Sequence, residues 1–264
     1  MRVVTLLYHD IVDSDFEESG FPGRDAARYK LRCDEFDQHL AAIRAADVAT
    51  PGSASDIVSD SEERLLLFTV DDGGVSALAI ADRIERLGWR GQFFVTTARI
   101  GTRAFLARAD IRDLGARGHV IGSHSHTHPY RISELPAAEL DREWRHSIGI
   151  LSDICGEQVA TASVPGGFYA PRVAHAAQGA GVRVLFTSEP TTHVESVGAC
   201  AVVGRFTIYR GMGPVAAANL ARGWPLALAR QQAVWFAKKT AKTMAAPLWD
   251  GMRRRLFRQP GART

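Results

Sequence analysis

Two adjacent carboxylates, Asp71 and Asp72, stand between a run of apolar residues and two glycines in the segment TVDDGG. The run over 64–70 (RLLLFTV) has the composition of a strand that is covered on both faces, so the acids follow a strand end. One carboxylate can bind a cation there, while the other stays free as a base for nearby water. Helix capping is the alternative role of Asp, but two acids before two glycines favour the metal site.

Three histidines, His124, His126 and His128, lie within five residues in the segment HSHTHP. Two neutral imidazoles four residues apart can chelate one ion when the chain between them bends, and imidazole is a good ligand for Zn²⁺. A solvated cluster or hydrogen-bonded core histidines are the alternatives. Because the chain has only nine histidines, this concentration favours a metal site. The HExxH pattern of helical metalloproteases is absent from the sequence.

A third segment, SVPGGFY, places Pro165, Gly166 and Gly167 after an apolar stretch. Glycines let the backbone pass close to a ligand, and exposed amides there can hold the oxyanion of a tetrahedral intermediate. An ordinary tight turn is the alternative for this loop.

The elements that position these segments alternate along the chain. Apolar runs predict strands at 3–8, 64–70, 92–96, 119–123, 159–164, 182–187 and 201–208. Helical periodicity predicts helices at 34–46, 75–87, 104–116, 133–154 and 170–179, with surface loops at 13–32 and 51–62. Alternation at this spacing predicts a parallel sheet, and so many strands favour a (β/α) barrel over an open sheet. Each polar segment follows a strand, on the side where such folds build their sites.

Taken together, TVDDG, HSHTHP, SVPGGFY and the opening LLYHDI resemble the NodB-type polysaccharide deacetylase (carbohydrate esterase) family over roughly residues 1–210. The resemblance implies a distorted (β/α) barrel of about seven parallel strands and a divalent metal ion, with zinc preferred. It also implies that Asp71 is the general base and that Asp72, His124 and His128 are the metal ligands. His126 falls on a variable position of the motif.

The sequence departs from this family at two places. Ser163 stands where the family commonly has an arginine that pairs with the base, and we expect Arg205 or Arg99 to replace it. The late Leu-x-His motif, which supplies the family's general acid, is absent. We expect His9, at the end of the first strand, to take that role, with His193 as the second choice.

These features predict a hydrolase of amide C–N bonds that removes N-acetyl groups from a polysaccharide, an oligosaccharide or a lipid-linked sugar. One alternative is a metal-dependent amidohydrolase that acts on a non-sugar C–N bond. The other is a catalytically weak protein that keeps the metal and binds saccharide. No nucleic-acid motif accompanies the basic residues, so we expect no nucleic-acid partner.

The composition, 46 % hydrophobic and 23 % charged over 264 residues, is typical of a soluble globular protein. The apolar run near Met1 is too short for a signal peptide, and no stretch reaches the roughly 20 apolar residues of a membrane helix. We therefore expect a cytoplasmic location. The three cysteines, at 33, 155 and 200, are predicted to be buried thiols rather than disulfides or metal ligands.

Charge divides the chain unevenly, because 12 Lys and Arg residues but one acid follow residue 200. We predict a barrel domain over 1–215 and a basic, amphipathic helical extension over 216–264, with a helix at 225–258 that kinks at Pro247. This extension either packs on the barrel by its apolar face or lies on an anionic membrane surface. The second case would place the protein peripherally at the inner face of the membrane.

Overall fold

A curled sheet of nine strands forms the centre of the computed structural model, which describes residues 2–46, 48–58, 64–237 and 240. The strand order is β11-β1-β4-β5-β6-β7-β8-β10-β9, and every neighbouring pair is parallel except β9 with β10. The strands are β1 Arg2–Tyr8, β4 Arg64–Val70, β5 Gln92–Val95, β6 Val120–Ser123, β7 Thr161–Ser163, β8 Val184–Phe186, β9 Val194–Val197, β10 Cys200–Val203 and β11 Phe206–Thr207. A parallel pair, β2 Ile11–Val12 and β3 Leu31–Arg32, lies apart from this sheet.

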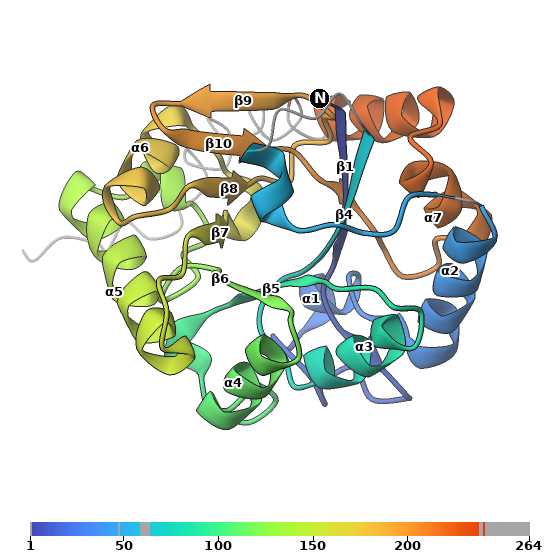
Figure 1. Cartoon of the computed structure of the whole chain (residues 1–264), viewed down its shortest axis with the longest axis horizontal. Coiled ribbons are helices and arrows are strands. Elements are labelled where there is room, and N and C mark those ends of the chain that lie inside the picture. The colour runs from blue at the N-terminus through green and yellow to red at the C-terminus, as the bar shows by residue number, and fades with distance from the viewer. Residues whose placement is uncertain (1, 47, 59–63, 238–239, 241–264) are drawn as a thin grey trace, which may run out of the picture.

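The stretch over 200–207 touches both edges of the curled sheet. Its first half, β10, pairs with β8, and its second half, β11, pairs with β1. Only Gly204 and Arg205 separate the two halves, so one kinked segment links the strands that an open sheet would leave apart. The predicted strand at 201–208 is therefore divided in two, and the expected distorted (β/α) barrel is confirmed as a curled, mostly parallel sheet inside a ring of helices (Figure 1).

The helices cover the outer face of the sheet (Figure 1). They are α2 Cys33–Ala45, α3 Ser76–Glu85, α4 Arg108–Ala116, α5 Ala137–Cys155, α6 Pro171–Gly179 and α7 Pro214–Ala221. The expected start of α5 at residue 133 is wrong. A 3-10 turn, η3 Ile132–Glu134, comes first, and Leu135 is extended (ψ 147°) because the residue before a proline avoids the helical region. Pro136 then precedes the helix, where its missing amide costs nothing.

Two predicted loops contain short elements. The segment over 13–32 includes the one-turn helix α1 Arg24–Ala27 and the strand β3, which pairs with β2. The segment over 51–62 includes the 3-10 turn η1 Ala54–Val58. The polar composition of both segments predicted loops, and elements of two to five residues are too short to show a periodic pattern in the sequence.

Side chains divide between two apolar clusters by the alternation of the strands. The larger one lies between the sheet and the helices and holds Trp144 and Leu151 of α5. The smaller one fills the inside of the curled sheet and is formed by Val3, Ala54, Ile57, Leu67, Phe94, Val184, Phe186 and Val203. Burial of a Leu or Phe side chain contributes about 1.5–3 kcal/mol, so the apolar runs that mark the strands in the sequence also hold the barrel together.

The C-terminal part of the described chain is helical. The predicted boundary after residue 215 falls within α7, and a further helix runs over 225–237. The predicted kink at Pro247 lies outside the described residues. Among the residues that the structure describes, no helix is long and apolar enough to cross a membrane. All three cysteines are free, but only Cys200 is fully buried, whereas Cys33 and Cys155 are half-buried.

Candidate active site

Asp71 and Asp72 follow β4 at the carboxyl end of the sheet. The amide of Asp71 continues the strand ladder by donating to the carbonyl of Tyr8 over 3.0 Å. Asp72 then turns into the left-handed region, with a φ of 77°. This turn interrupts the strict alternation of a strand, so that both carboxylates remain at the same end of the barrel. Both are buried, at 3 % and 8 % exposure.

His124 and His128 come from the turn that follows β6. The amide of His124 donates to the carbonyl of Val95 over 2.9 Å, and the amide of His128 donates to Ser125 Oγ over 3.1 Å. Ser125 and His128 both have positive φ, at 63° and 59°. Three of the four positive-φ residues other than glycine among the described residues thus belong to this cluster. Left-handed backbone at such residues is typical of functional sites.

The ligand atoms of Asp72, His124 and His128 all lie within 4.8 Å of one another. Asp72 Oδ1 is 3.4 Å from His124 Nε2 and 3.6 Å from His128 Nε2. Two atoms bound to one tetrahedral Zn²⁺ at about 2.0–2.1 Å lie roughly 3.3–3.4 Å apart. The residues present therefore fit a divalent ion, with one carboxylate and two imidazole donors turned toward a common point.

Ser163 fixes the orientation of His124. His124 Nδ1 is 2.6 Å from Ser163 Oγ, which in turn donates to Asp71 Oδ1 over 3.1 Å. Because the serine proton is directed at the carboxylate, Ser163 Oγ accepts from Nδ1–H, which leaves the lone pair of His124 on Nε2. That nitrogen is the one that faces Asp72, so the hydrogen bond selects the tautomer that a metal needs.

Arg205 is the cation that pairs with Asp71. Its NH1 and NH2 groups donate to Oδ1 and Oδ2 of Asp71 over 2.7 and 2.8 Å, in the bidentate geometry of a strong Arg–carboxylate pair. The guanidinium is 1 % exposed and lies inside the curled sheet, where its Nε donates to the carbonyl of Thr187. The other expected candidate, Arg99, instead lies over the ring of Phe21 at 5.3 Å.

Electrostatics keep both carboxylates ionised. Burial by itself would raise the pKa of Asp71, but Arg205 and His124 outweigh that effect and hold the pKa below its usual value. Burial likewise opposes ionisation of Asp72, but the neighbouring His124, His9 and His128 hold its pKa below its usual value. Burial and the neighbouring His124 lower the pKa of His128 to about 4, so that its ring is neutral and able to bind a metal at neutral pH.

His9 lies beside this cluster at the end of β1. It is close enough to Asp71 and Asp72 to lower the pKa of each. Its ring lies tilted against that of Tyr29, with centroids 4.8 Å apart, and its buried Nδ1 has no hydrogen-bond partner among the described residues. His193, the second choice for a general acid, is exposed just before β9.

The loop over Pro165–Gly167 forms the 3-10 turn η4, directly after β7 and Ser163. Gly166 has a φ of 67°, and a side chain there would collide with the carbonyl of Tyr130. Glycine is therefore required at this position for both its backbone conformation and its close packing. The turn lies next to the segment that carries His128, so the three polar segments of the sequence meet at one end of the sheet.

Sequence reasoning missed a second layer of polar groups behind the two acids. Asp10, 2 % exposed, accepts hydrogen bonds from Ser19 Oγ (2.6 Å) and Ser76 Oγ (2.8 Å). These bonds tie the loop after β2 to the start of α3, directly after the DDGG segment. Gly74 must be glycine, because a Cβ there would overlap the carboxylate of Asp10. The signal for Asp10 was its place beside His9 at a strand end. The approach of Phe21 to His128, at 4.6 Å, had no sequence signal.

Several other histidines have partners away from the cluster. His39 bonds to the carbonyl of Met212, and His119 bonds to Glu85. His126 stacks on His146 at 4.2 Å and pairs with Thr97, so its ring has partners other than His124 and His128 of its own segment.

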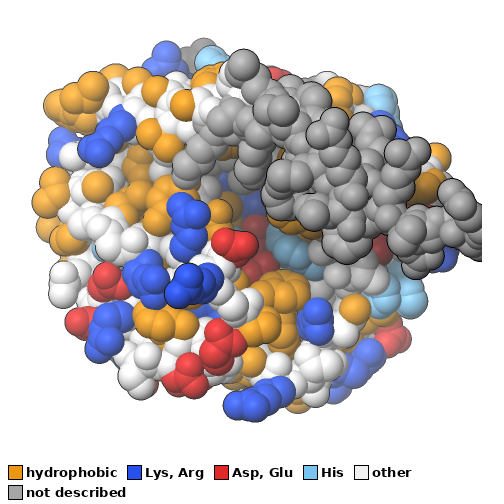
Figure 2. Space-filling model, turned by 180° about the vertical axis from the view of Figure 1, so that it is seen from behind, with side chains coloured by type: hydrophobic (Ala, Val, Ile, Leu, Met, Phe, Trp, Pro, Cys, Tyr) orange, Lys and Arg blue, Asp and Glu red, His pale blue; other side chains and the backbone are white. Residues whose placement is uncertain are grey.

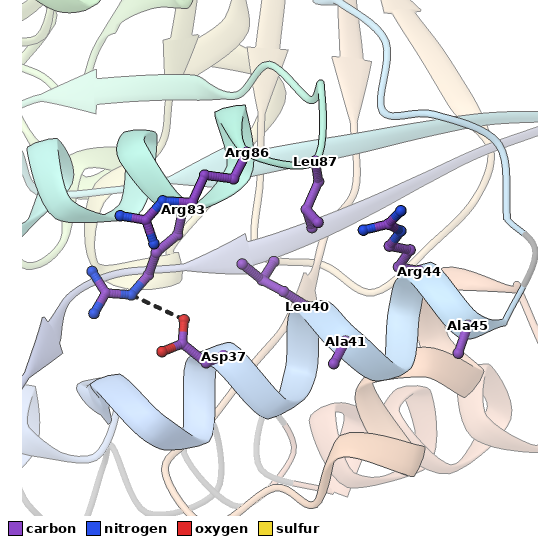
Figure 3. Close-up of a pocket in the computed structure, with 8 residues that line it drawn as sticks. All are labelled: Asp37, Leu40, Ala41, Arg44, Ala45, Arg83, Arg86 and Leu87. Atoms are coloured by element: carbon purple, nitrogen blue, oxygen red, sulfur yellow. Dashed lines mark hydrogen bonds and ion pairs between the residues drawn. The ribbon is translucent and has the colours of Figure 1, made fainter.

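A groove of about 520 Å³ lies between α2 and α3 (Figure 3). Its wall includes an ion pair of 3.0 Å between Arg83 and Asp37. None of its lining residues belongs to the cluster described above. Acidic and histidine side chains instead lie together in a recess of the face seen in Figure 2.

Comparison with known proteins places these residues in a family. The model of the family described as polysaccharide deacetylase matches residues 59–185, which include both the DDGG and the HSHTHP segments. Comparison with curated protein sequences gives no match.

Solved structures share the fold over most of the chain. The Streptococcus pyogenes deacetylase PplD in complex with acetate is 16 % identical (TM-score 0.67), with 81 % of this chain and 95 % of that chain covered. IcaB from Ammonifex degensii is 22 % identical (TM-score 0.65; 88 % and 97 % covered). A polysaccharide deacetylase from Bacillus cereus is 15 % identical (TM-score 0.68; 84 % and 69 % covered).

At these identities the similarity of structure establishes the fold, and the family match adds the class of reaction, hydrolysis of amide C–N bonds. The resemblance carried by the three polar segments is thereby confirmed. Residues 59–185, with the paired acids and the histidine turn that they contain, belong to the polysaccharide deacetylase family.

Proposed function

We propose that this chain is a metal-dependent deacetylase that hydrolyses the N-acetyl group of a saccharide and that Asp72, His124 and His128 hold its Zn²⁺. One observation carries the proposal: three converging ligand atoms stand beside a second carboxylate, Asp71, which is not one of them. A metal-binding protein without catalysis has no need for a buried, ionised carboxylate next to its ligands.

When bound, the ion supplies Lewis acidity, which polarises the acetyl carbonyl and makes water easier to deprotonate. Asp71 accepts a proton from the attacking water as the new C–O bond forms. Arg205 keeps this carboxylate ionised and aligned through its two hydrogen bonds. Amides of the Pro165–Gly167 turn are the proposed donors to the oxyanion.

Collapse of the tetrahedral intermediate breaks the C–N bond and requires a proton on the departing nitrogen. His9 is the proposed source, since it is the histidine beside both carboxylates that is not among the three ligands. The products are acetate, which keeps the oxygen of the water, and the free sugar amine. The similar Streptococcus pyogenes deacetylase was solved with acetate, the carboxylate that this reaction releases.

Aromatic side chains around the cluster suit a saccharide better than a small polar amide. Phe21 lies 4.6 Å from the ring of His128, and Tyr29 lies 4.8 Å from that of His9. Tyr130, 63 % exposed, contacts Phe168 at 5.2 Å. Flat apolar rings with polar edges can pack against the C–H faces of sugar rings while a few polar groups fix the orientation.

The alternative of a catalytically weak binding protein rested on the missing cation at position 163 and on the missing Leu-x-His acid. Arg205 pairs with Asp71 from the kink between β10 and β11, so the first reason no longer holds. The proposed role of His9 answers the second. A non-sugar amide remains the rival substrate, because the same residues would attack any acetamide that fits.

Amine release from N-acetylglucosamine oligomers tests the proposal, with acetylated lysine peptides as the non-sugar amides. We expect sugar-dependent release that a chelator abolishes and Zn²⁺ restores. Asp71→Asn should keep the metal and lose activity by at least about 10²-fold, whereas Asp72→Ala should lose the metal. His146→Ala, an exposed histidine outside the cluster, is the matched control. Equal rates for the parent and Asp71→Asn would refute the proposal.

A further inference from the structure

The helix over residues 225–237 has apolar side chains on two opposite faces. Its inner face packs on the barrel through Ala227 and Leu228, and Gln231 Nε2 donates to the carbonyl of Thr207 over 2.7 Å. The opposite side, here called the outer face, consists of Leu226, Ala229, Ala233, Val234 and Phe236, all of which are exposed. A surface helix normally carries polar residues on that side, so this apolar stripe has no role in the fold of the barrel.

The outer face exposes more contiguous apolar surface than single apolar residues on a protein surface do. Leu226 is 74 % exposed, Phe236 is 60 % exposed and Val234 is 44 % exposed. Leu226, Ala229, Ala233 and Phe236 follow one another at intervals of three or four residues and therefore form a continuous line along the helix. Contiguous exposed apolar surface of this kind is typical of interaction sites, whereas single exposed residues are not.

The helix lies against the barrel near β1. It begins next to Trp224, which lines a cavity of about 710 Å³ together with Arg2 of β1 and Leu66 of β4. Seven residues later, Gln231 reaches Thr207, which pairs with Leu7 of β1. In Figure 1 the helix is the red element beside the N-terminus. The outer face thus lies on the flank of the barrel, beside β1.

The charge of the residues around the outer face indicates which kind of partner binds it. Residues 210–237 contain three arginines and no acid, and residues 238–258 contain seven Lys and Arg residues and one Asp. A second copy of this chain that docked through the same face would bring like charges together. A nucleic acid would meet the arginines but would leave the apolar line exposed to water. An anionic lipid surface offers both an apolar layer and negative head groups.

We propose that the outer face of the 225–237 helix is a peripheral docking surface for an anionic lipid bilayer. Leu226 and Phe236 enter the interface between head groups and acyl chains, while Arg222 and Arg230 contact the anionic head groups. Docking of this kind requires no membrane-spanning helix. It is also independent of the deacetylase reaction, because none of these residues belongs to the metal cluster.

Flotation of the full chain with vesicles tests this proposal. We expect binding to vesicles of phosphatidylcholine with one quarter phosphatidylglycerol, little binding to phosphatidylcholine alone, and loss of binding at high salt. The double variant Leu226→Gln/Phe236→Gln should bind at least about tenfold more weakly, because both anchors become polar. Val215→Gln, which replaces another exposed apolar residue (69 %) outside the helix, should bind as the parent does.

The double variant keeps all basic residues, so it separates the apolar face from charge alone. Unchanged thermal unfolding and amine release would show that the variant is folded. Equal vesicle binding by the folded double variant and the parent would overturn the proposal. A parent dimer in solution that the double variant abolishes, without vesicle binding by the parent, would also overturn it in favour of a second copy.

Discussion

At the scale of single residues, the different roles proposed for Asp71 and Asp72 follow from their different partners. Asp72 faces two imidazole nitrogens at 3.4 and 3.6 Å, which suits a metal ligand. Asp71 is bound on both oxygens by Arg205 and also accepts from Ser163. These hydrogen bonds orient Asp71 and keep it ionised, and Asp71 is not one of the three converging ligand residues. A general base needs these properties, because it must be free to accept a proton.

Replacement of Arg205 tests this assignment through the pH dependence of the reaction. Arg205 opposes the effect of burial and lowers the pKa of Asp71, so its removal should raise that pKa. A base works when deprotonated, and the acid limb of kcat/KM should therefore move to higher pH in Arg205→Met. Loss of one partner of a buried pair should also destabilise the fold by about 3–5 kcal/mol.

Arg99→Met is the control for this experiment, because Arg99 lies over Phe21 rather than beside Asp71. Its acid limb should stay where the parent has it. A folded Arg205→Met protein with the parental pH profile would show that Asp71 is not the base.

At the scale of elements, the site depends on how chain segments approach one another after the strands end. The DDGG segment leaves β4, turns through the positive φ of Asp72 and begins α3 against Asp10 and Ser76. Any side chain at Gly74 would enter the space of the Asp10 carboxylate. Gly74 thus serves close packing at the end of the strand.

Two glycine substitutions should therefore have opposite effects on stability. Gly74→Ala should lower the free energy of unfolding by about 1–3 kcal/mol and reduce activity, because the shift of Asp10 displaces the neighbouring acids. Gly149→Ala, in the exposed face of α5 with nothing near its Cβ position, should raise that free energy by roughly 0.5–1 kcal/mol. Denaturant unfolding of the two variants measures both changes. Equal effects would contradict the packing described for Gly74.

At the scale of the whole molecule, the proposed metal site joins segments from distant parts of the chain. Asp72 follows β4, whereas His124 and His128 follow β6, with β5 between these strands in the sheet. An ion bound by all three residues would link the two segments in the folded state only, so it should stabilise the whole domain.

Thermal unfolding with and without Zn²⁺ should show this linkage. Free metal at about 100 times its Kd contributes about 2.7 kcal/mol, which corresponds to a rise in Tm of roughly 5–10 °C for a domain of this size. A chelator should reverse the rise. Asp72→Ala should show no response to metal, and a parental response in this variant would place the ion elsewhere.

The sequence by itself determined the parallel α/β architecture and the candidate residues. Long apolar strands, amphipathic helices and the DDGG and HSHTHP segments are local patterns, and hydrophobic periodicity reports them directly. Parallel strands also bring their carboxyl ends to one edge, so the meeting of the three polar segments followed from topology alone.

Tertiary structure alone decided which cation serves Asp71 and which hydroxyl orients His124. Arg205 is 134 residues from Asp71 in sequence, and it reaches the acid because the 200–207 segment kinks and enters the inside of the curled sheet. Ser163 likewise meets His124 only across neighbouring strands. Such contacts depend on strand register, strand curvature and side-chain direction in three dimensions. None of these properties produces a hydrophobic periodicity that can be recognised in the sequence.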